Sequence, residues 1–124
     1  MDELHHGSCL CGAVHYQLSS ALKAITHCHC RRCQKAHGAA FATYGSVPGS
    51  ALSLIDPAAT LKAYESSPGV TRQFCGDCGA SLFWRNSQGP YADWISIAIA
   101  TLDTPLPPAR QKHSCLDQKA CWYE

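Results

Sequence analysis

The chain has 124 residues, 46% of them hydrophobic, and a formal net charge of +1. This length fits one domain, residues 1–124, with a packed core. Such a balanced charge argues against nucleic-acid binding, which usually requires a basic face. No apolar run is long enough to span a membrane, and the polar start of the chain lacks the apolar segment of a secretory signal. We therefore expect a cytoplasmic protein, monomer or homodimer, that binds neither nucleic acid nor membrane.

Short apolar stretches alternate with turn residues along the chain, which predicts an all-β fold. Val14, Tyr16 and Leu18 alternate with polar residues, as in a strand with one buried face. The expected strands span residues 13–18, 24–27, 39–44, 53–55, 61–64, 70–74, 81–84 and 94–100. Only residues 31–37 have a composition typical of a helix. The segment 109–124 has weak periodicity and no assignment, and His5 and His6 are expected in a loose N-terminus.

Seven of the nine cysteines fall in three tight clusters. These are Cys9-x-Cys11, Cys28-x-Cys30-x-x-Cys33 and Cys75-x-x-Cys78. In a reducing compartment such clusters indicate metal binding or catalysis rather than disulfides. Zinc takes four protein ligands at structural sites, whereas catalytic sites have three and keep one position open. Seven thiolates divide naturally as four plus three, which predicts one closed and one open site.

The closed site is expected to combine the first and third clusters. Cys75 and Cys78, followed by glycine, have the form of a zinc knuckle. Cys9 and Cys11 point to the same side of an extended segment, so both thiols can reach one metal. A thioredoxin-like redox pair at Cys75 and Cys78 is the weaker interpretation, because that motif occurs in a βαβ context.

The second cluster has three thiols within six residues, Cys28, Cys30 and Cys33. They can bind one metal as a tripod with a free fourth position. Neighbouring cations favour thiolates over thiols and suit a small anionic ligand; these cations are Arg31, Arg32 and Lys35. One alternative is a second closed site whose fourth ligand is His27, His29 or His37. Another places Cys9, Cys11, Cys28 and Cys30 on one metal.

Three further residues lie outside these clusters. Cys115 and Cys121 are most simply small buried apolar residues, although their spacing permits a local disulfide or extra ligation. His113 is expected to have a structural role.

These residues carry a resemblance to a known family. The matching segments are Gly7-Ser8-Cys9-Leu10-Cys11-Gly12, Cys28-His29-Cys30-Arg31-Arg32-Cys33, Tyr64-Glu65-Ser66-Ser67-Pro68-Gly69 and Arg72-Gln73-Phe74-Cys75-Gly76-Asp77-Cys78-Gly79. In order and spacing the chain resembles the glutathione-dependent formaldehyde-activating enzyme family, which also includes centromere protein V. The resemblance covers about residues 7–108. The tail departs from the pattern after His113.

The resemblance implies a β-tent fold stabilised by zinc. It implies a structural zinc at Cys9, Cys11, Cys75 and Cys78, and a labile, catalytic zinc at Cys28, Cys30 and Cys33. It also implies that glutathione is a cosubstrate that binds beside the second zinc. Because glutathione carries carboxylates, we expect Arg31, Arg32 or Lys35 to hold them. The activity implied is that of a carbon–sulfur lyase.

Three functions are therefore considered. The first is a zinc-dependent carbon–sulfur lyase acting on a small-molecule thiol adduct, for example in the formation of S-hydroxymethylglutathione, with His29 or His37 moving the proton. The second is a non-enzymatic, zinc-stabilised binding module, because a fold and its metal do not fix a substrate. The third is an enzyme similar to methionine sulfoxide reductases, which needs a recycling pair such as Cys115 and Cys121.

Overall fold

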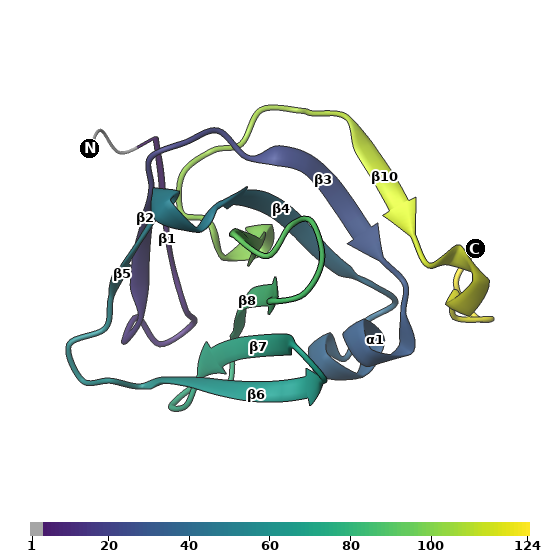
Figure 1. Ribbon diagram of the computed structural model, residues 1–124, viewed down its shortest axis with the longest axis horizontal. Coiled ribbons are helices and arrows are strands. Elements are labelled where there is room, and N and C mark those ends of the chain that lie inside the picture. Colours follow the sequence, from purple (N-terminus) through teal and green to yellow (C-terminus); the bar gives the residue numbers. More distant parts are fainter. Residues whose placement is uncertain (1–3) are drawn as a thin grey trace.

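The computed structural model describes residues 4–124 (Figure 1). Ten strands and one α-helix follow in chain order: β1 His5–Ser8, β2 His15–Leu18, β3 Lys23–Cys28, α1 Arg31–His37, β4 Ala42–Pro48, β5 Leu52–Ile55, β6 Leu61–Ser67, β7 Val70–Cys75, β8 Ser81–Asn86, β9 Trp94–Ala98 and β10 Gln111–Ser114. Three 3-10 turns, Gly49–Ala51, Ile99–Thr101 and Leu116–Gln118, complete it. The predicted all-β, single-domain fold is confirmed.

The strands form two sheets. The smaller has the order β1-β2-β5, and the larger has the order β10-β3-β4-β9-β8-β7-β6. All neighbours are antiparallel except β10, which runs parallel to β3. In Figure 1 β3 and β10 run side by side toward the end of the molecule where α1 and the C-terminus lie. The larger sheet thus brings the end of β3, α1 and the C-terminal segment together.

The main core lies between the two sheets. Period-two alternation turns Tyr16 and Leu18 of β2 inward, and both are fully buried. The Tyr16 ring meets Phe83 of β8 edge-on, with 5.3 Å between ring centroids. Gly7 passes so close to Tyr16 that a Cβ atom there would overlap the ring. These contacts fix the smaller sheet, and with it the loop that carries the first cysteine cluster.

The predicted strands are present with shifted ends, and two strands were not predicted. β1 pairs with β2 from His5↔Leu18 to Ser8↔His15, so the expectation of a loose N-terminus at His5 is wrong. The strand expected over 94–100 ends at Ala98. Residues 1–3, part of the polar start that was not expected to be a secretory signal, lie outside the described residues. Within residues 4–124 no helix has the length and apolar character needed to cross a bilayer.

Candidate metal centres

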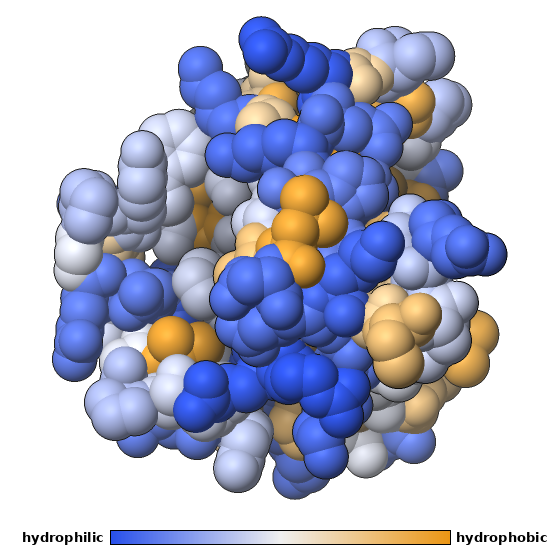
Figure 2. Space-filling model, turned by 90° about the vertical axis from the view of Figure 1, so that its right-hand side faces the viewer, coloured by the Kyte–Doolittle hydropathy of each residue, from blue (hydrophilic) through white to orange (hydrophobic). Residues whose placement is uncertain are grey.

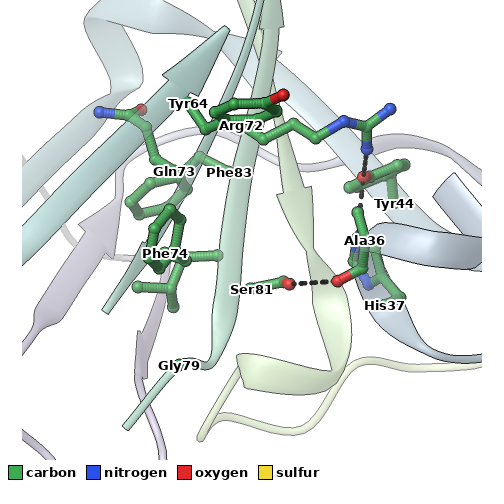
Figure 3. Close-up of a pocket in the computed structure, with 11 residues that line it drawn as sticks. Ala36, His37, Tyr44, Tyr64, Arg72, Gln73, Phe74, Gly79, Ser81 and Phe83 are labelled. Carbon is green, nitrogen blue, oxygen red and sulfur yellow. Dashed lines mark hydrogen bonds between the residues drawn. The ribbon is translucent and has the colours of Figure 1, made fainter. Parts of the chain in front are cut away.

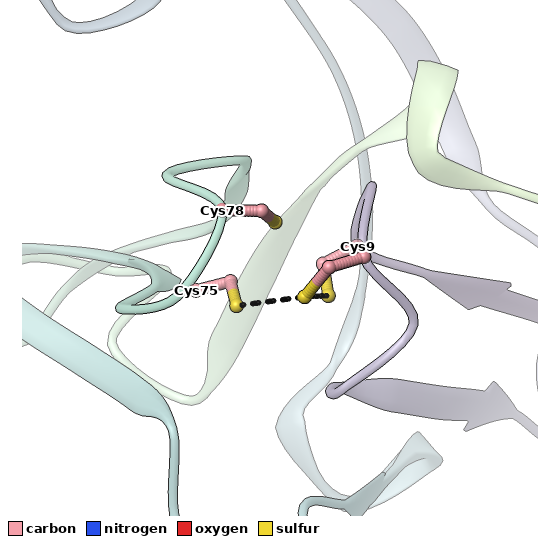
Figure 4. Close-up of side chains that lie close together, drawn as sticks. Cys9, Cys75 and Cys78 are labelled. Atoms are coloured by element: carbon pink, nitrogen blue, oxygen red, sulfur yellow. Dashed lines mark hydrogen bonds between the residues drawn. The ribbon is translucent and has the colours of Figure 1, made fainter.

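The first and third cysteine clusters meet at one end of the core (Figure 4). The Sγ atoms of Cys9, Cys11, Cys75 and Cys78 all lie within 4.8 Å of one another. The Sγ atoms of Cys9 and Cys11 are 3.7 Å apart, and those of Cys11 and Cys75 are 3.8 Å apart. Sulfur atoms on one tetrahedral zinc are about 3.8 Å apart, given Zn–S bonds of about 2.3 Å. The four thiols therefore fit the predicted closed zinc site.

Two tight turns with glycine place these sulfurs. Gly12 and Gly79 both adopt left-handed conformations, with φ of 81° and 78°, which glycine adopts at little cost. The Val14 N–H donates to the Cys9 sulfur at 3.3 Å. Hydrogen bonds from the backbone N–H groups of Ala80 and Cys11 lower the pKa of Cys78 to about 6. The turn at Cys78 therefore favours its thiolate form, which is the form that binds metal, whereas desolvation and the neighbouring thiols raise the pKa of Cys11 to about 12.

The second cluster lies where β3 joins α1. The Sγ atoms of Cys28, Cys30 and Cys33 also lie within 4.8 Å of one another. Cys30 caps the helix, because its sulfur accepts a hydrogen bond from the Cys33 N–H at 3.3 Å. The Cys33 thiol donates to Cys28, which lowers the pKa of Cys28 to about 4 and raises that of Cys33. The two groups share no cysteine, so the alternative that places Cys9, Cys11, Cys28 and Cys30 on one metal is wrong.

Arg72 of β7 contacts this cluster, although the sequence indicated it only within a family segment and not as a cation of the site. Both terminal nitrogens of its guanidinium lie 3.6 Å from the Cys33 sulfur. Its Nε donates to the Ser66 hydroxyl at 2.9 Å. The Tyr44 hydroxyl lies 3.5 Å from Arg72 and 3.0 Å from Nε2 of His37. Arg72, Tyr44 and His37 line a cavity of about 470 Å³ (Figure 3).

The three cations expected to bind an anion, Arg31, Arg32 and Lys35, lie on α1 but do not line the cavity beside Arg72. The Arg31 guanidinium donates to the Gln34 side chain at 2.6 Å, and the Arg31 N–H donates to the Gln118 side chain at 2.9 Å. Arg31 and Lys35, one helical turn apart, line a small cavity of about 220 Å³ next to Trp122. Arg32 is exposed. Cys33, by contrast, faces Arg72.

The histidines near the cluster bind each other or neighbouring hydroxyls. His29 is fully buried, and its Nε2 pairs with Nδ1 of His113 at 2.7 Å; among residues 4–124 its Nδ1 has no hydrogen-bond partner. His27 contacts the Thr43 hydroxyl and the Gln111 side chain, at 2.9 and 2.6 Å. Burial lowers the pKa of His29 and of His37. Within the described chain, neither metal-ligand group contains a histidine.

The C-terminal segment covers the outer side of this cluster. β10 pairs Ser114 with Cys28, and the Ser114 carbonyl accepts the His29 N–H at 3.0 Å. Cys115 follows in a left-handed conformation, with φ of 57°. Burial and the neighbouring Cys28 thiolate raise the pKa of Cys115. Cys115 therefore lies beside the tripod, where the extra ligation that its spacing permitted remains a prediction. The expectation that Cys115 and Cys121 are small buried residues is wrong, because both are exposed. The side of the molecule where the segment lies is largely hydrophilic, with small hydrophobic patches (Figure 2).

Fold and site together define a cysteine-rich, all-β protein with one four-thiol and one three-thiol group. The model of the glutathione-dependent formaldehyde-activating enzyme family matches residues 4–123, so the chain belongs to that family. A Phaeosphaeria nodorum protein that carries the same enzyme name is 38% identical over 77 residues. That match covers 62% of this chain and 40% of the relative, so the chain spans about two fifths of that relative's length.

Two further similarities cover most of the chain. A Schizosaccharomyces pombe protein described as a lyase is 27% identical over 126 residues, which covers 97% of this chain and 84% of that protein. The crystal structure of a Rhodobacter sphaeroides protein superposes with a TM-score of 0.70 at 21% identity, covering 88% of this chain and 99% of that one. This second likeness shows that the fold is shared.

Proposed function

We propose that the protein is a zinc-dependent carbon–sulfur lyase that acts on a glutathione adduct, for example by forming S-hydroxymethylglutathione. The observation that carries the proposal is the group of three thiols at Cys28, Cys30 and Cys33, which lies beside Arg72 and a cavity of about 470 Å³. Membership of the formaldehyde-activating family supports the reaction. The two-sheet arrangement supports the β-tent architecture that the resemblance implies.

The two groups would hold different zinc ions. Cys9, Cys11, Cys75 and Cys78 would hold a structural ion, because four sulfurs complete its tetrahedron. Cys28, Cys30 and Cys33 would hold the catalytic ion. When bound, that ion supplies an open coordination position at which a substrate thiol loses its proton. The two groups of clustered cysteines indicate metal binding rather than disulfides, which supports a reducing compartment such as the cytoplasm.

The chain's own residues would orient the site and move the proton. Arg72 contacts the Cys33 sulfur through both terminal nitrogens, and its positive charge favours the thiolate. When the sulfur of glutathione adds to formaldehyde, a carbon–sulfur bond forms and the carbonyl oxygen takes up a proton. Of the two histidines considered for this transfer, His37 lines the cavity and contacts the Tyr44 hydroxyl, whereas His29 is buried against His113. We assign the transfer to His37.

The test combines metal content, binding and catalysis. Zinc-loaded protein should bind glutathione more tightly than S-methylglutathione, because the methylated sulfur cannot become a thiolate. It should also accelerate the exchange between formaldehyde and S-hydroxymethylglutathione, which NMR exchange spectroscopy measures against the uncatalysed rate. The matched control is Cys121→Ser, because Cys121 is exposed and belongs to neither group. Equal binding of glutathione and S-methylglutathione, or an exchange rate equal to that of buffer, would contradict the proposal.

A further inference from the structure

A second cavity, larger than the one beside Arg72, lies on one face of the larger sheet. Its volume is about 650 Å³. Ser46, Ser96 and Trp84 come from three neighbouring strands and lie in one row of its floor, through the pairings Ser46↔Ser96 and Trp84↔Ser96. Thr26 of β3 lines the cavity beside this row, since it pairs with Tyr44, two residues before Ser46. We call this cavity the sheet groove. The functions discussed so far do not use it.

The sheet groove begins next to the three-thiol group. Cys28 follows Thr26 by two residues on β3, so both side chains point to the same face of the sheet, about 6.6 Å apart along the strand. Beside them on β10, Lys112 pairs with Thr26 and Ser114 pairs with Cys28. Trp84 lines the groove and also packs against the buried cluster around Cys33. A ligand whose sulfur is at Cys28 can therefore extend along β3, past Thr26, into the groove.

The groove is positively charged on one side. Lys23 and Lys112 line it, and no aspartate or glutamate does. Within residues 4–124 neither lysine takes part in an ion pair. Two unpaired ammonium groups in a groove without acidic side chains favour an anionic ligand such as a carboxylate.

The groove also offers aromatic surface and hydrogen-bonding groups. Trp84, Trp94 and Tyr91 contribute aromatic rings, which provide apolar contact area with polar edges. The hydroxyls of Ser46 and Ser96 lie 3.1 Å apart on the floor. This combination suits amide groups, which are flat and carry hydrogen-bond donors and acceptors.

The cavity beside Arg72 lacks a free cation. Its one guanidinium, that of Arg72, already contacts Cys33, Ser66 and Tyr44. Its remaining lining is mainly aromatic and small residues, including Phe74. The charge therefore favours the sheet groove for the anionic part of a substrate.

We propose that the sheet groove binds the body of the thiol substrate, and that Lys23 and Lys112 bind its carboxylate. The substrate class is then a small peptide-like thiol with a carboxylate about 10 Å from its sulfur at most, the span of three extended residues. The inference rests on the proposed function, because it assumes that the sulfur binds at the Cys28 group. It assigns carboxylate binding to Lys23 and Lys112 in place of Arg31, Arg32 and Lys35.

The experiment uses the zinc-loaded full chain carrying Trp122→Phe. This change removes the tryptophan of the tail, so that fluorescence reports Trp84 and Trp94, both of which line the groove. Glutathione should change this fluorescence, and Lys23→Gln with Lys112→Gln should weaken its binding about tenfold by calorimetry. Glutathione monoethyl ester, which lacks the glycine carboxylate, should bind the original protein more weakly, and the two lysine changes should affect it much less. Lys62→Gln, an exposed lysine of β6, is the matched control.

The outcomes separate the two proposals. Unchanged glutathione affinity in the double lysine variant would overturn the groove and leave the lyase proposal standing. A loss of affinity in Lys35→Gln together with that result would return the carboxylate to α1. If zinc-loaded protein binds neither thiol, both proposals fail. Circular dichroism of each variant must match that of the unmodified chain, because a folding defect would weaken the binding of glutathione and of its ester equally.

Discussion

Arg72 donates to the sulfur of Cys33 through both terminal nitrogens of its guanidinium, at 3.6 Å each. The two residues are 39 positions apart in the chain, and they come from β7 and α1. Burial of a thiolate is unfavourable unless a positive group or hydrogen bonds compensate. Arg72 provides both, and Ser66 fixes its orientation by accepting from Nε.

Arg72→Met should therefore weaken metal binding at the three-thiol group. Groups that contact a metal ligand typically change affinity by about 10–100-fold when removed. We expect a loss of this size in competition with a chromophoric chelator, whereas the four-thiol group keeps its zinc. Arg72→Lys should restore part of the loss, because the charge returns without the two-pronged geometry. Arg110→Met serves as the control, and an affinity unchanged in Arg72→Met would show that the contact has no such role.

The four-thiol group should be required for folding. Cys78→Ala removes one of the sulfurs that join the loop after β1 to the turn between β7 and β8. Binding of structural zinc contributes about 10–16 kcal/mol in small domains, which is comparable to the whole stability of about 5–15 kcal/mol expected for such a protein. We expect Cys78→Ala to lose the cooperative thermal unfolding transition measured by circular dichroism, whereas the control Cys121→Ala should keep it. A cooperatively folded Cys78→Ala protein without zinc would rule out this role.

Local patterns predicted much of this structure. The alternation around Tyr16 and Leu18 gave the buried face of β2, and the cysteine spacing gave the division into four and three thiols. β10 escaped prediction because the residues Gln111–Ser114 are mainly exposed. That strand is held by pairing of its backbone with β3, which leaves no apolar alternation in the sequence.

The surroundings of the cluster depend on long-range pairing, which spacing alone does not reveal. Proximity in sequence favoured Arg31 and Lys35 as the cations of the site. The helix turns both toward the cavity beside Trp122. Arg72 reaches Cys33 only because β7 and α1 meet in the fold. Cys115 reaches Cys28 through the parallel pairing of β10 with β3.

Cys30→Ser should separate the second site from the fold. Serine is a favourable N-cap residue, so its hydroxyl can accept the Cys33 N–H in place of the sulfur and preserve α1. A neutral hydroxyl is a poor zinc ligand compared with a thiolate. We expect the zinc content to fall from two ions per chain to one, with loss of lyase activity and a melting temperature within a few degrees of the original. Two zinc ions retained in elemental analysis would contradict the assignment.

Tyr16→Phe should change the dependence of stability on alkaline pH. The Thr101 hydroxyl donates to the Ala98 carbonyl at 2.7 Å, so the Tyr16 hydroxyl donates to Thr101, also at 2.7 Å. Burial raises the pKa of Tyr16 to about 12, whereas tyrosine in an unfolded chain ionises near pH 10. Between these values the unfolded state has lost a proton that the folded state keeps, so stability falls as pH rises.

At pH 8 the Tyr16→Phe variant should be about 1 kcal/mol less stable in urea unfolding, because it lacks one hydrogen bond. At pH 11 this difference should shrink or reverse. As a control, the stability of the exposed Tyr91→Phe variant should follow that of the original protein at both pH values. If the stability of Tyr16→Phe also changed with pH in parallel with the original protein, the Tyr16 hydroxyl would not resist ionisation in the core.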